Sequence, residues 1–286
     1  MCEHRTAEAG AALEAGAGDP AGGAGAPLFR IRDASVVRAG RTILHVGDFS
    51  LAEGEHVALL GPNGAGKSTF IQLLTREVFP LWREEPPVLF RGQARPLLTE
   101  IRATLGIVSA TMQEQVRVHA PAEDIVCGGL FGTLGLPPQV RATEANRAAA
   151  CEALEHLGIG ELARRDVMTL STGQLRRVLV ARELVRDPQV LIFDEPCTGL
   201  DPQGMWHVRA TMGALAAEGR SVVLVTHYPE DIIPAIRRVL LIKDAEVFAD
   251  GPKEALLTGE VMSALFDVPL VVSQTDGWYA LRGAYA

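Results

Sequence analysis

The sequence predicts an α/β protein in which helices cover a mainly parallel β-sheet. Three features of the 286-residue chain indicate this fold class. In the second half, apolar runs of strand length alternate with segments of helical periodicity, which is typical of strand–helix–strand units in a parallel sheet. Near the N-terminus, strand-sized runs follow one another without helices, which predicts a smaller antiparallel β portion. Between these parts, residues 120–186 are predominantly helical in pattern.

The chain divides into three regions. Residues 1–26 contain nine Ala and six Gly but few large apolar side chains, so we expect a disordered tail. An Ala-rich helix is the alternative, but the glycines and Pro20 would interrupt it repeatedly. We expect the main domain over residues 27–250, with a helical subdomain at about 111–169. Residues 251–286 form a C-terminal extension.

Strand-sized apolar runs bounded by turn residues open the main domain. A helix is expected over Lys67–Val78, because apolar residues between Phe70 and Leu74 recur at helical spacing. The predicted strands of this half are Leu28–Ile31, Ser35–Val37, Thr42–Val46, His56–Leu60, Val88–Phe90 and Thr104–Val108.

The second half predicts the alternating pattern of the parallel sheet. Helices are expected over Ala145–Leu157, Gln174–Val185 and around Gly204–Ala217. The predicted strands are Val190–Phe193, Ser221–Val225, Val239–Lys243 and Glu246–Ala249.

Composition excludes several classes of protein. The net charge of -8 argues against a broad basic surface, so no nucleic-acid partner is expected. No apolar run reaches the roughly 18 residues that a membrane-spanning helix needs, and the N-terminus has no apolar core of a signal peptide. The four cysteines are far apart without a C-x-x-C pair, so we expect reduced thiols in the cytosol.

A glycine-rich motif follows the predicted strand His56–Leu60. It fits G-x-x-x-x-G-K-[ST] and stands between a strand and a helix, which is the context of a phosphate-binding P-loop. The backbone N–H groups of such a loop and the helix N-terminus surround phosphate, the lysine reaches the β- and γ-phosphates, and the serine hydroxyl binds Mg²⁺. The motif therefore predicts binding of ATP and Mg²⁺ by Gly61, Pro62, Asn63, Gly64, Ala65, Gly66, Lys67, Ser68 and Thr69.

A second motif ends an apolar strand in two carboxylates. Val190–Phe193 runs directly into Asp194 and Glu195, a Walker B pattern. In a parallel sheet these carboxylates would lie beside the P-loop. We expect Asp194 to hold Mg²⁺ and Glu195 to polarise the attacking water. Alone, this pattern is usually a surface turn, but the P-loop gives it a functional meaning.

A third motif, Leu170-Ser171-Thr172-Gly173-Gln174, opens the predicted helix Gln174–Val185. Ser171 could simply cap this helix. Together with the two preceding motifs, however, the segment resembles the Leu-Ser-Gly-Gly-Gln signature of ATP-binding cassette (ABC) ATPases, with Thr172 in place of the first glycine. The resemblance covers about residues 28–250. It implies that Ser171, Gly173 and Gln174 contact the γ-phosphate held by a partner subunit.

Two further segments match the same family in order. Cys197-Thr-Gly-Leu200-Asp201 resembles the D-loop, and His227 stands where the family has its switch histidine. The resemblance implies that Asp201 reaches across a dimer interface and that His227 contacts the γ-phosphate. Cys197 has no charged neighbour in sequence that would activate its thiol, so we expect it to be inert.

Two positions depart from the family pattern. The family places an aromatic residue against adenine shortly before a segment that aligns with Arg41–Leu44, and Arg38 stands there in this chain. A planar guanidinium can also stack on a base. The family also has a glutamine after the strand ending near Val108, linking Mg²⁺ to the membrane partner, where this chain has Ser109. Gln113 is the candidate replacement, unless no glutamine takes this role.

The resemblance implies an ATPase in which ATP is hydrolysed in a dimeric sandwich. We expect a homodimer or a paired ATPase subunit, bound to separate transmembrane permease subunits at the cytoplasmic face of the membrane. An importer of metals or metal chelates is the favoured transporter type, with Thr111–Leu136 as an apolar, Gly-rich docking surface. The alternative is a soluble ABC ATPase that acts in translation or DNA repair.

Overall fold

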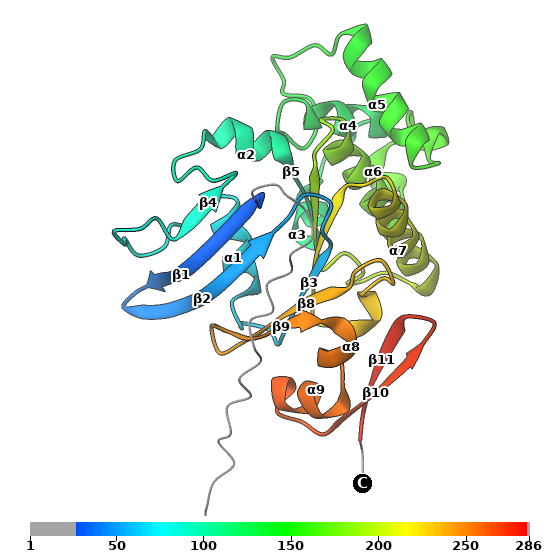
Figure 1. Ribbon diagram of the computed structural model, residues 1–286. Coiled ribbons are helices and arrows are strands. Elements are labelled where there is room, and N and C mark those ends of the chain that lie inside the picture. Colours follow the sequence, from blue (N-terminus) through cyan, green and yellow to red (C-terminus); the bar gives the residue numbers. More distant parts are fainter. Residues whose placement is uncertain (1–26, 285–286) are drawn as a thin grey trace, which may run out of the picture.

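The computed structural model describes residues 27–284, so the predicted tail over residues 1–26 lies outside the described chain. The described residues form an α/β fold around one nine-stranded sheet with the order β4-β1-β2-β9-β8-β3-β7-β6-β5 (Figure 1). Strands β8, β3, β7, β6 and β5 are mutually parallel, which confirms the predicted fold class. No helix among residues 27–284 is long and apolar enough to cross a bilayer.

Most predicted elements are present, with ends shifted by a few residues. The strands are β1 (Phe29–Arg38), β2 (Arg41–Leu51), β3 (Val57–Leu60), β4 (Val88–Phe90), β5 (Leu105–Ser109), β6 (Val190–Asp194), β7 (Ser221–Thr226), β8 (Arg238–Lys243), β9 (Glu246–Pro252), β10 (Leu270–Thr275) and β11 (Trp278–Gly283). The α-helices are α1 (Lys67–Leu74), α2 (Leu98–Thr104), α3 (Ala110–Gln115), α4 (Ala122–Gly129), α5 (Glu144–His156), α6 (Thr172–Leu184), α7 (Pro202–Ala217), α8 (Lys253–Leu256) and α9 (Gly259–Phe266), and the 3₁₀ turns are η1 (Gly160–Leu162), η2 (Val167–Thr169) and η3 (Pro229–Asp231).

Two boundaries differ from the prediction for reasons of backbone geometry. The two predicted strands before residue 38 form the single strand β1, because its ladder with β2 continues past Asp33, whose backbone is left-handed at φ 43°. Helix α1 ends at Leu74 instead of Val78. Arg76 adopts φ 60°, and a left-handed residue ends an α-helix.

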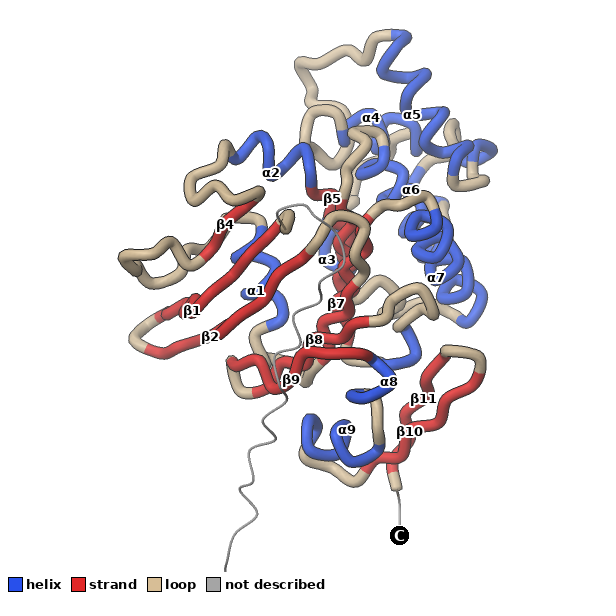
Figure 2. Tube along the Cα trace, in the orientation of Figure 1, coloured by secondary structure: helices blue, strands red, loops and turns tan. Residues whose placement is uncertain are grey.

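Side chains of the parallel strands alternate between two cores. Ala58 and Leu60 of β3 pack in the core that includes α6 and α7, whereas Val57 and Leu59 pack in the core that includes α1. Figure 2 shows α1 and α7 on opposite sides of the sheet. The sheet is therefore covered on both faces, as expected for strand–helix–strand units. The phosphate-binding motif follows the C-terminal end of β3, and the two carboxylates lie at the C-terminal end of β6.

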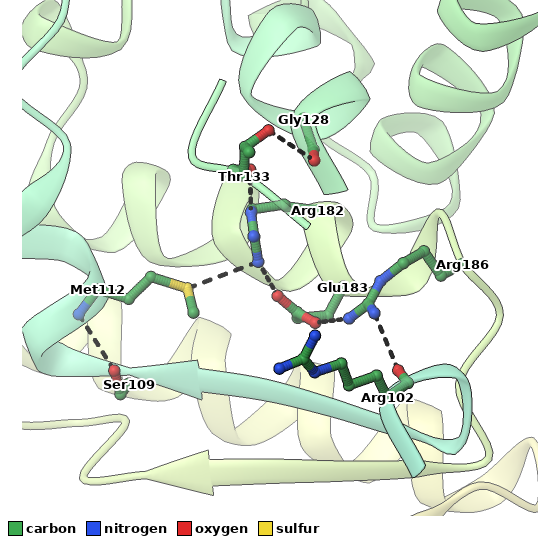
Figure 3. Close-up of polar contacts among 8 residues, drawn as sticks. All are labelled: Arg102, Ser109, Met112, Gly128, Thr133, Arg182, Glu183 and Arg186. Carbon is green, nitrogen blue, oxygen red and sulfur yellow. Dashed lines mark hydrogen bonds and ion pairs between the residues drawn. The ribbon is translucent and has the colours of Figure 1, made fainter. Parts of the chain in front are cut away.

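The glycine-rich part of the predicted helical subdomain is packed against α6. A side-chain carbon at Gly129 would collide with the Arg182 carbonyl oxygen, and one at Gly128 would collide with the backbone of Gly135. Arg182 donates from Nε to the Thr133 carbonyl oxygen at 2.9 Å (Figure 3). Gly128 and Gly129 are buried. These two glycines therefore serve internal packing, a different role from the docking surface that the sequence predicts for them.

An ion cluster centred on the buried Glu183 extends this packing to α2. Glu183 lies between Arg182 and Arg186 and is ion-paired with both (Figure 3). Arg186 also donates to the Arg102 carbonyl oxygen at 2.9 Å. The carboxylate therefore has a cationic partner on each side, as a buried charge requires.

The C-terminal extension folds back onto the main domain. Strands β10 and β11 form a separate antiparallel hairpin. The buried Lys253 donates from Nζ to the Pro234 carbonyl oxygen at 3.1 Å, and Glu230 accepts the Leu281 N–H at 2.6 Å. The hairpin is thus attached to the segment that follows β7, where Tyr279 is buried.

Candidate active site

The phosphate-binding loop connects β3 to α1, and its glycines are needed for its shape. Gly64 and Gly66 adopt φ 78° and φ 114°, a region that favours glycine. At Gly61 a side-chain carbon would collide with the Ile242 carbonyl oxygen of β8. The loop therefore fits between neighbouring strands only with these residues. Its backbone leads directly into the N-terminus of α1.

Lys67 lies inside this loop and is 6% exposed. Its Nζ donates to the carbonyl oxygens of Gly61 and Pro62, at 2.7 and 2.9 Å. Burial lowers the pKa of the ammonium group, and the nearby carboxylates of Glu195 and Asp194 oppose this shift. The loop thus holds a cation that faces two acids. Asn63 and Ser68 of the same motif are exposed, and Thr69 is half-buried.

Strand β6 delivers the two carboxylates beside the loop. Asp194 is paired in register with Ser109 on β5 and Val225 on β7. Burial raises the pKa of Asp194, the negative charge of Glu195 raises it further, and Lys67 lowers it. Glu195 adopts φ 49°, and its N–H donates to the Val225 carbonyl oxygen at 2.8 Å. This left-handed backbone is an uncommon conformation that costs free energy and is frequent at functional sites.

His227 follows β7 and faces the second carboxylate. Its Nδ1 lies 3.4 Å from Glu195 Oε1. The separation suits an ion pair if the imidazole is protonated, but the two atoms are not aligned for a hydrogen bond. Residues predicted from three separate segments therefore meet at the C-terminal ends of the parallel strands. They are Lys67, Asp194, Glu195 and His227.

The donor set of this cluster suits a divalent cation such as Mg²⁺. Asp194 and Ser68 offer hard oxygen ligands, which Mg²⁺ prefers. Burial and the neighbouring carboxylate of Glu195 raise the pKa of Asp194, so a second cation in addition to Lys67 would relieve the repulsion between the two carboxylates. Asp194 and Ser68 would hold the ion, as the sequence predicts.

Gln113, the candidate for the family's loop glutamine, makes a hydrogen bond to α6. Its Oε1 accepts a hydrogen bond from Arg176 Nε at 2.8 Å. Ser109, which stands at the family's glutamine position, caps α3 by accepting the Met112 N–H at 3.1 Å. The Gln113 amide oxygen is therefore hydrogen-bonded to an arginine of α6.

Arg176 is the residue that sequence reasoning missed. It is 2% exposed and donates from Nη1 to the carbonyl oxygens of Glu195 and Pro196, at 3.3 and 2.9 Å. Burial lowers the pKa of its guanidinium. Arg176 joins α3, α6 and the turn that carries Glu195. The sequence shows only an arginine next to the apolar face of a helix, and no local pattern indicates its contacts.

The signature segment forms the N-terminus of α6, where Ser171 and Thr172 are exposed and Gly173 and Gln174 are half-buried. Ser171 Oγ accepts the Gln174 N–H at 3.2 Å, and Gln174 Oε1 accepts the Ser171 N–H at 3.0 Å. This reciprocal capping box fixes the helix end. A side-chain carbon at Gly173 would lie 3.1 Å from Gly204 Cα of α7. The signature therefore adjoins the start of α7.

Asp201 caps α7 next to this point. Its Oδ1 accepts the Gly204 N–H at 2.7 Å. Among residues 27–284, no hydrogen bond or ion pair joins Ser171, Gly173 or Asp201 to Lys67 or to the two carboxylates. The predicted site residues thus fall into two groups, one around the phosphate-binding loop and one around the signature.

The remaining predicted residues lie apart from both groups. Arg38 is exposed at the end of β1, opposite Arg41 in the β1–β2 hairpin. Cys197 is buried, and burial raises the pKa of its thiol to about 12. A thiol with this pKa is almost entirely protonated near neutral pH. This agrees with the expectation of an inert cysteine.

The arrangement of these motifs is shared with known proteins. The sequence profile of the family described as ABC transporter matches residues 44–198. The chain belongs to this family. Relatives include the ABC transporter ATP-binding protein YlmA of Bacillus subtilis, which is 34% identical over 247 residues, 86% of this chain and 93% of YlmA. The hemin import ATP-binding protein HmuV of Rhodopseudomonas palustris is 31% identical over 251 residues, covering 84% of this chain and 91% of HmuV.

A solved structure shares the fold over nearly the whole chain. It is an inward-facing structure described as a metal-chelate type ABC transporter, with a TM-score of 0.74 and 23% identity. The match covers 91% of this chain and 98% of that chain. This structure supports the fold, while the family match and the curated relatives show that the chain is an ATP-binding protein that hydrolyses ATP to power transport. The predictions of family, fold and enzyme class are confirmed.

Proposed function

We propose that this ABC ATPase hydrolyses ATP in a sandwich of two subunits. The separation of the two residue groups carries this proposal. Lys67 has hydrogen-bond partners in its own loop, whereas Ser171 and Gly173 lie at a helix N-terminus that, within residues 27–284, has no hydrogen bond or ion pair to Lys67. A helix N-terminus attracts anions. The signature of one subunit is thus suited to cover the γ-phosphate held by the loop of the other.

Within this sandwich the residues have distinct roles. Gly61–Thr69 surround the phosphates, and Lys67 leaves its backbone carbonyl partners to neutralise phosphate charge. Glu195 accepts a proton from the attacking water and orients it, while His227 contacts the γ-phosphate from the neighbouring strand. Gln174 and Asp201 of the partner complete the signature side. Arg38 stacks on the base.

Mg²⁺ would bind to Ser68 and Asp194, and it would neutralise phosphate charge as ATP is hydrolysed. The hydroxyl and the carboxylate set the position of the ion relative to Lys67. Gln113 would take the place of the family glutamine that links Mg²⁺ to the membrane partner, and its amide oxygen accepts a hydrogen bond from Arg176.

The transported substrate we propose is a metal chelate, and the direction is import. HmuV, the hemin import relative, supports this because hemin is an iron chelate. The ATPase would act as a homodimer or with a paired ATPase subunit, at the cytoplasmic face of the membrane, bound to transmembrane permease subunits. The prediction of a translation or DNA-repair ATPase gains no support from these transporter relatives.

Isolation of the native complex tests the partner assignment. The tagged full chain is purified from detergent-solubilised membranes of the source cells, with tagged Lys67→Ala as a control for ATP-dependent association. We expect a permease subunit in near-equal amount to the ATPase. Recovery of ribosomes or DNA alone would contradict transport.

Reconstitution tests the substrate assignment. The complex in liposomes should import hemin when ATP is supplied. Its ATPase rate should rise when a hemin-loaded substrate-binding protein is added. A complex carrying Glu195→Gln should do neither. Stimulation by a sugar or amino acid but not by hemin would overturn the choice of substrate while leaving the ATPase role intact.

A further inference from the structure

A buried hydrogen-bond network closes the backbone around His227. Thr226, the residue before it, is 1% exposed and ends β7. Its Oγ1 accepts the Tyr228 N–H at 3.0 Å and donates to Asp231 Oδ2 at 2.9 Å. The Asp231 N–H in turn donates to the Tyr228 carbonyl oxygen at 3.1 Å. The hydroxyl of Thr226 thus ties together the residues on both sides of His227.

Among residues 27–284, no hydrogen bond to the His227 side chain sets the direction of the imidazole. Its Nδ1 is buried without a hydrogen-bond partner, although Glu195 Oε1 lies 3.4 Å away. Its ring contacts Tyr228, with centroids 3.9 Å apart, but Tyr228 is itself 51% exposed. The direction of the imidazole therefore depends on the backbone from Thr226 to Tyr228.

The same network reaches the helix that begins at Asp201. Asp231 is 3% exposed, and its Oδ1 accepts a hydrogen bond from Arg209 Nη2 of α7 at 2.7 Å. This is a partly buried ion pair between a helix and the segment after β7, in which Asp231 is the buried partner. Because Arg209 holds Asp231 and Asp231 holds Thr226, the position of α7 is transmitted to the backbone of His227.

We infer that Thr226, Asp231 and Arg209 form a positioning network for His227. Thr226 and Asp231 fix the backbone that aims the imidazole at the phosphate site. Arg209 connects this backbone segment to α7, whose N-cap residue is Asp201. Movement of Asp201 at the subunit interface would thereby shift His227 in the same chain. This inference rests on the proposed contact of His227 with the γ-phosphate.

A pair of substitutions at Thr226 tests the network. Thr226→Val keeps the shape and the strand preference of the side chain but removes the hydroxyl, whereas Thr226→Ser keeps the hydroxyl. We expect Thr226→Val to lower kcat about tenfold, because small displacements of a positioned group have large effects on rate. The KM for ATP should stay within about twofold, since the binding loop is unchanged. Thr226→Ser should stay near the wild-type rate.

A double variant separates positioning from general stability. His227→Ala should lower kcat more than Thr226→Val, and Thr226→Val should have no further effect in the His227→Ala background. Melting temperatures of all variants are measured alongside ATPase rates of the full chain. Independent, multiplicative losses in the double variant would overturn the network. A Thr226→Ser variant as slow as Thr226→Val would also overturn it.

The outcomes also separate this inference from the proposed function. If His227→Ala hydrolyses ATP at the wild-type rate, the proposed role of His227 fails, and the network fails with it. If His227→Ala is slow but a well-folded Thr226→Val is not, only the network is overturned.

Discussion

The phosphate-binding loop and the signature segment differ in how far their own chain completes them. The loop lies against β8 at Gly61, and Lys67 is buried with two backbone carbonyl partners. At the signature Ser171 is exposed, and the side chains of Ser171 and Gln174 each accept a hydrogen bond from the backbone N–H of the other. A buried polar group needs hydrogen-bond partners within the chain. The backbone N–H groups at an exposed helix N-terminus can instead bind water or a ligand. This difference is the basis of our proposal that the signature of a second chain completes the site.

The largest effect is expected where the loop depends on one charge. Lys67→Ala should lower the ATPase rate at least about 100-fold, because no other cation among residues 27–284 lies inside the phosphate-binding loop. Isothermal titration with ATP and steady-state rates would measure binding and turnover. As a control, Lys243→Ala removes an ammonium that binds Ala264 and Asp267 instead of the loop. Near-normal turnover in the Lys67 variant would show that the loop does not act on phosphate.

The next effect concerns the link between the two regions. Arg176→Lys keeps the charge but loses the fork that holds Gln113 and the Glu195 turn together, so kcat should fall about tenfold. Arg177→Lys, on the same helix, is the matched control, because Arg177 donates to the Leu157 carbonyl oxygen away from the site. Equal rates in both variants, at equal melting temperature, would remove Arg176 from the mechanism.

A smaller effect on the ATPase rate is expected at Ser109, which occupies the position of the family's loop glutamine, and at Gln113, the candidate replacement. Ser109→Ala removes a helix cap worth about 1 kcal/mol and should spare basal ATPase activity. Gln113→Ala should leave the basal rate within about threefold, yet weaken stimulation by the permease. ATPase assays with and without the reconstituted permease distinguish these effects. Full stimulation of the Gln113 variant would show that coupling takes another route.

Cys197 should show the smallest effect. Cys197→Ser is expected to change the ATPase rate less than about twofold, because the thiol is buried and protonated near neutral pH. The raised pKa, about 12, means that thiolate forms only as the pH approaches this value. Iodoacetamide labelling at pH 8, followed by mass spectrometry, should leave Cys197 unmodified in the folded protein and modify it after unfolding. Rapid labelling of the folded chain would contradict the assignment.

Much of the fold and of the loop could be predicted because their signals are local. The strand ending in Asp194 and Glu195, and the glycines before Lys67, require particular residues in consecutive positions. Arg176 could not be predicted in the same way, because its three acceptors come from segments that are distant in sequence. Asp231 is similar, since only the packing of α7 on the segment after β7 brings Arg209 to it.

The glycine-rich segment around Gly128 and Gly129 has a packing role that the sequence does not reveal. Gly128 and Gly129 stand out in sequence, and the family resemblance suggested an external role. Glycine is required at Gly129 for steric reasons, because α4 approaches the backbone of α6 at Arg182. A sequence pattern cannot by itself separate a glycine needed for internal contact from one needed at a surface.

Association of two chains tests the central claim most directly. Glu195→Gln keeps the size of the side chain but removes the carboxylate that accepts the proton from water. ATP should bind through Lys67, Ser68 and Asp194, and the signature of a second chain should close over it without hydrolysis. Size-exclusion chromatography should then show a dimer with Mg-ATP and a monomer with Mg-ADP, while the wild type stays largely monomeric at the same salt concentration. A variant that binds ATP yet remains a monomer would contradict the two-subunit site.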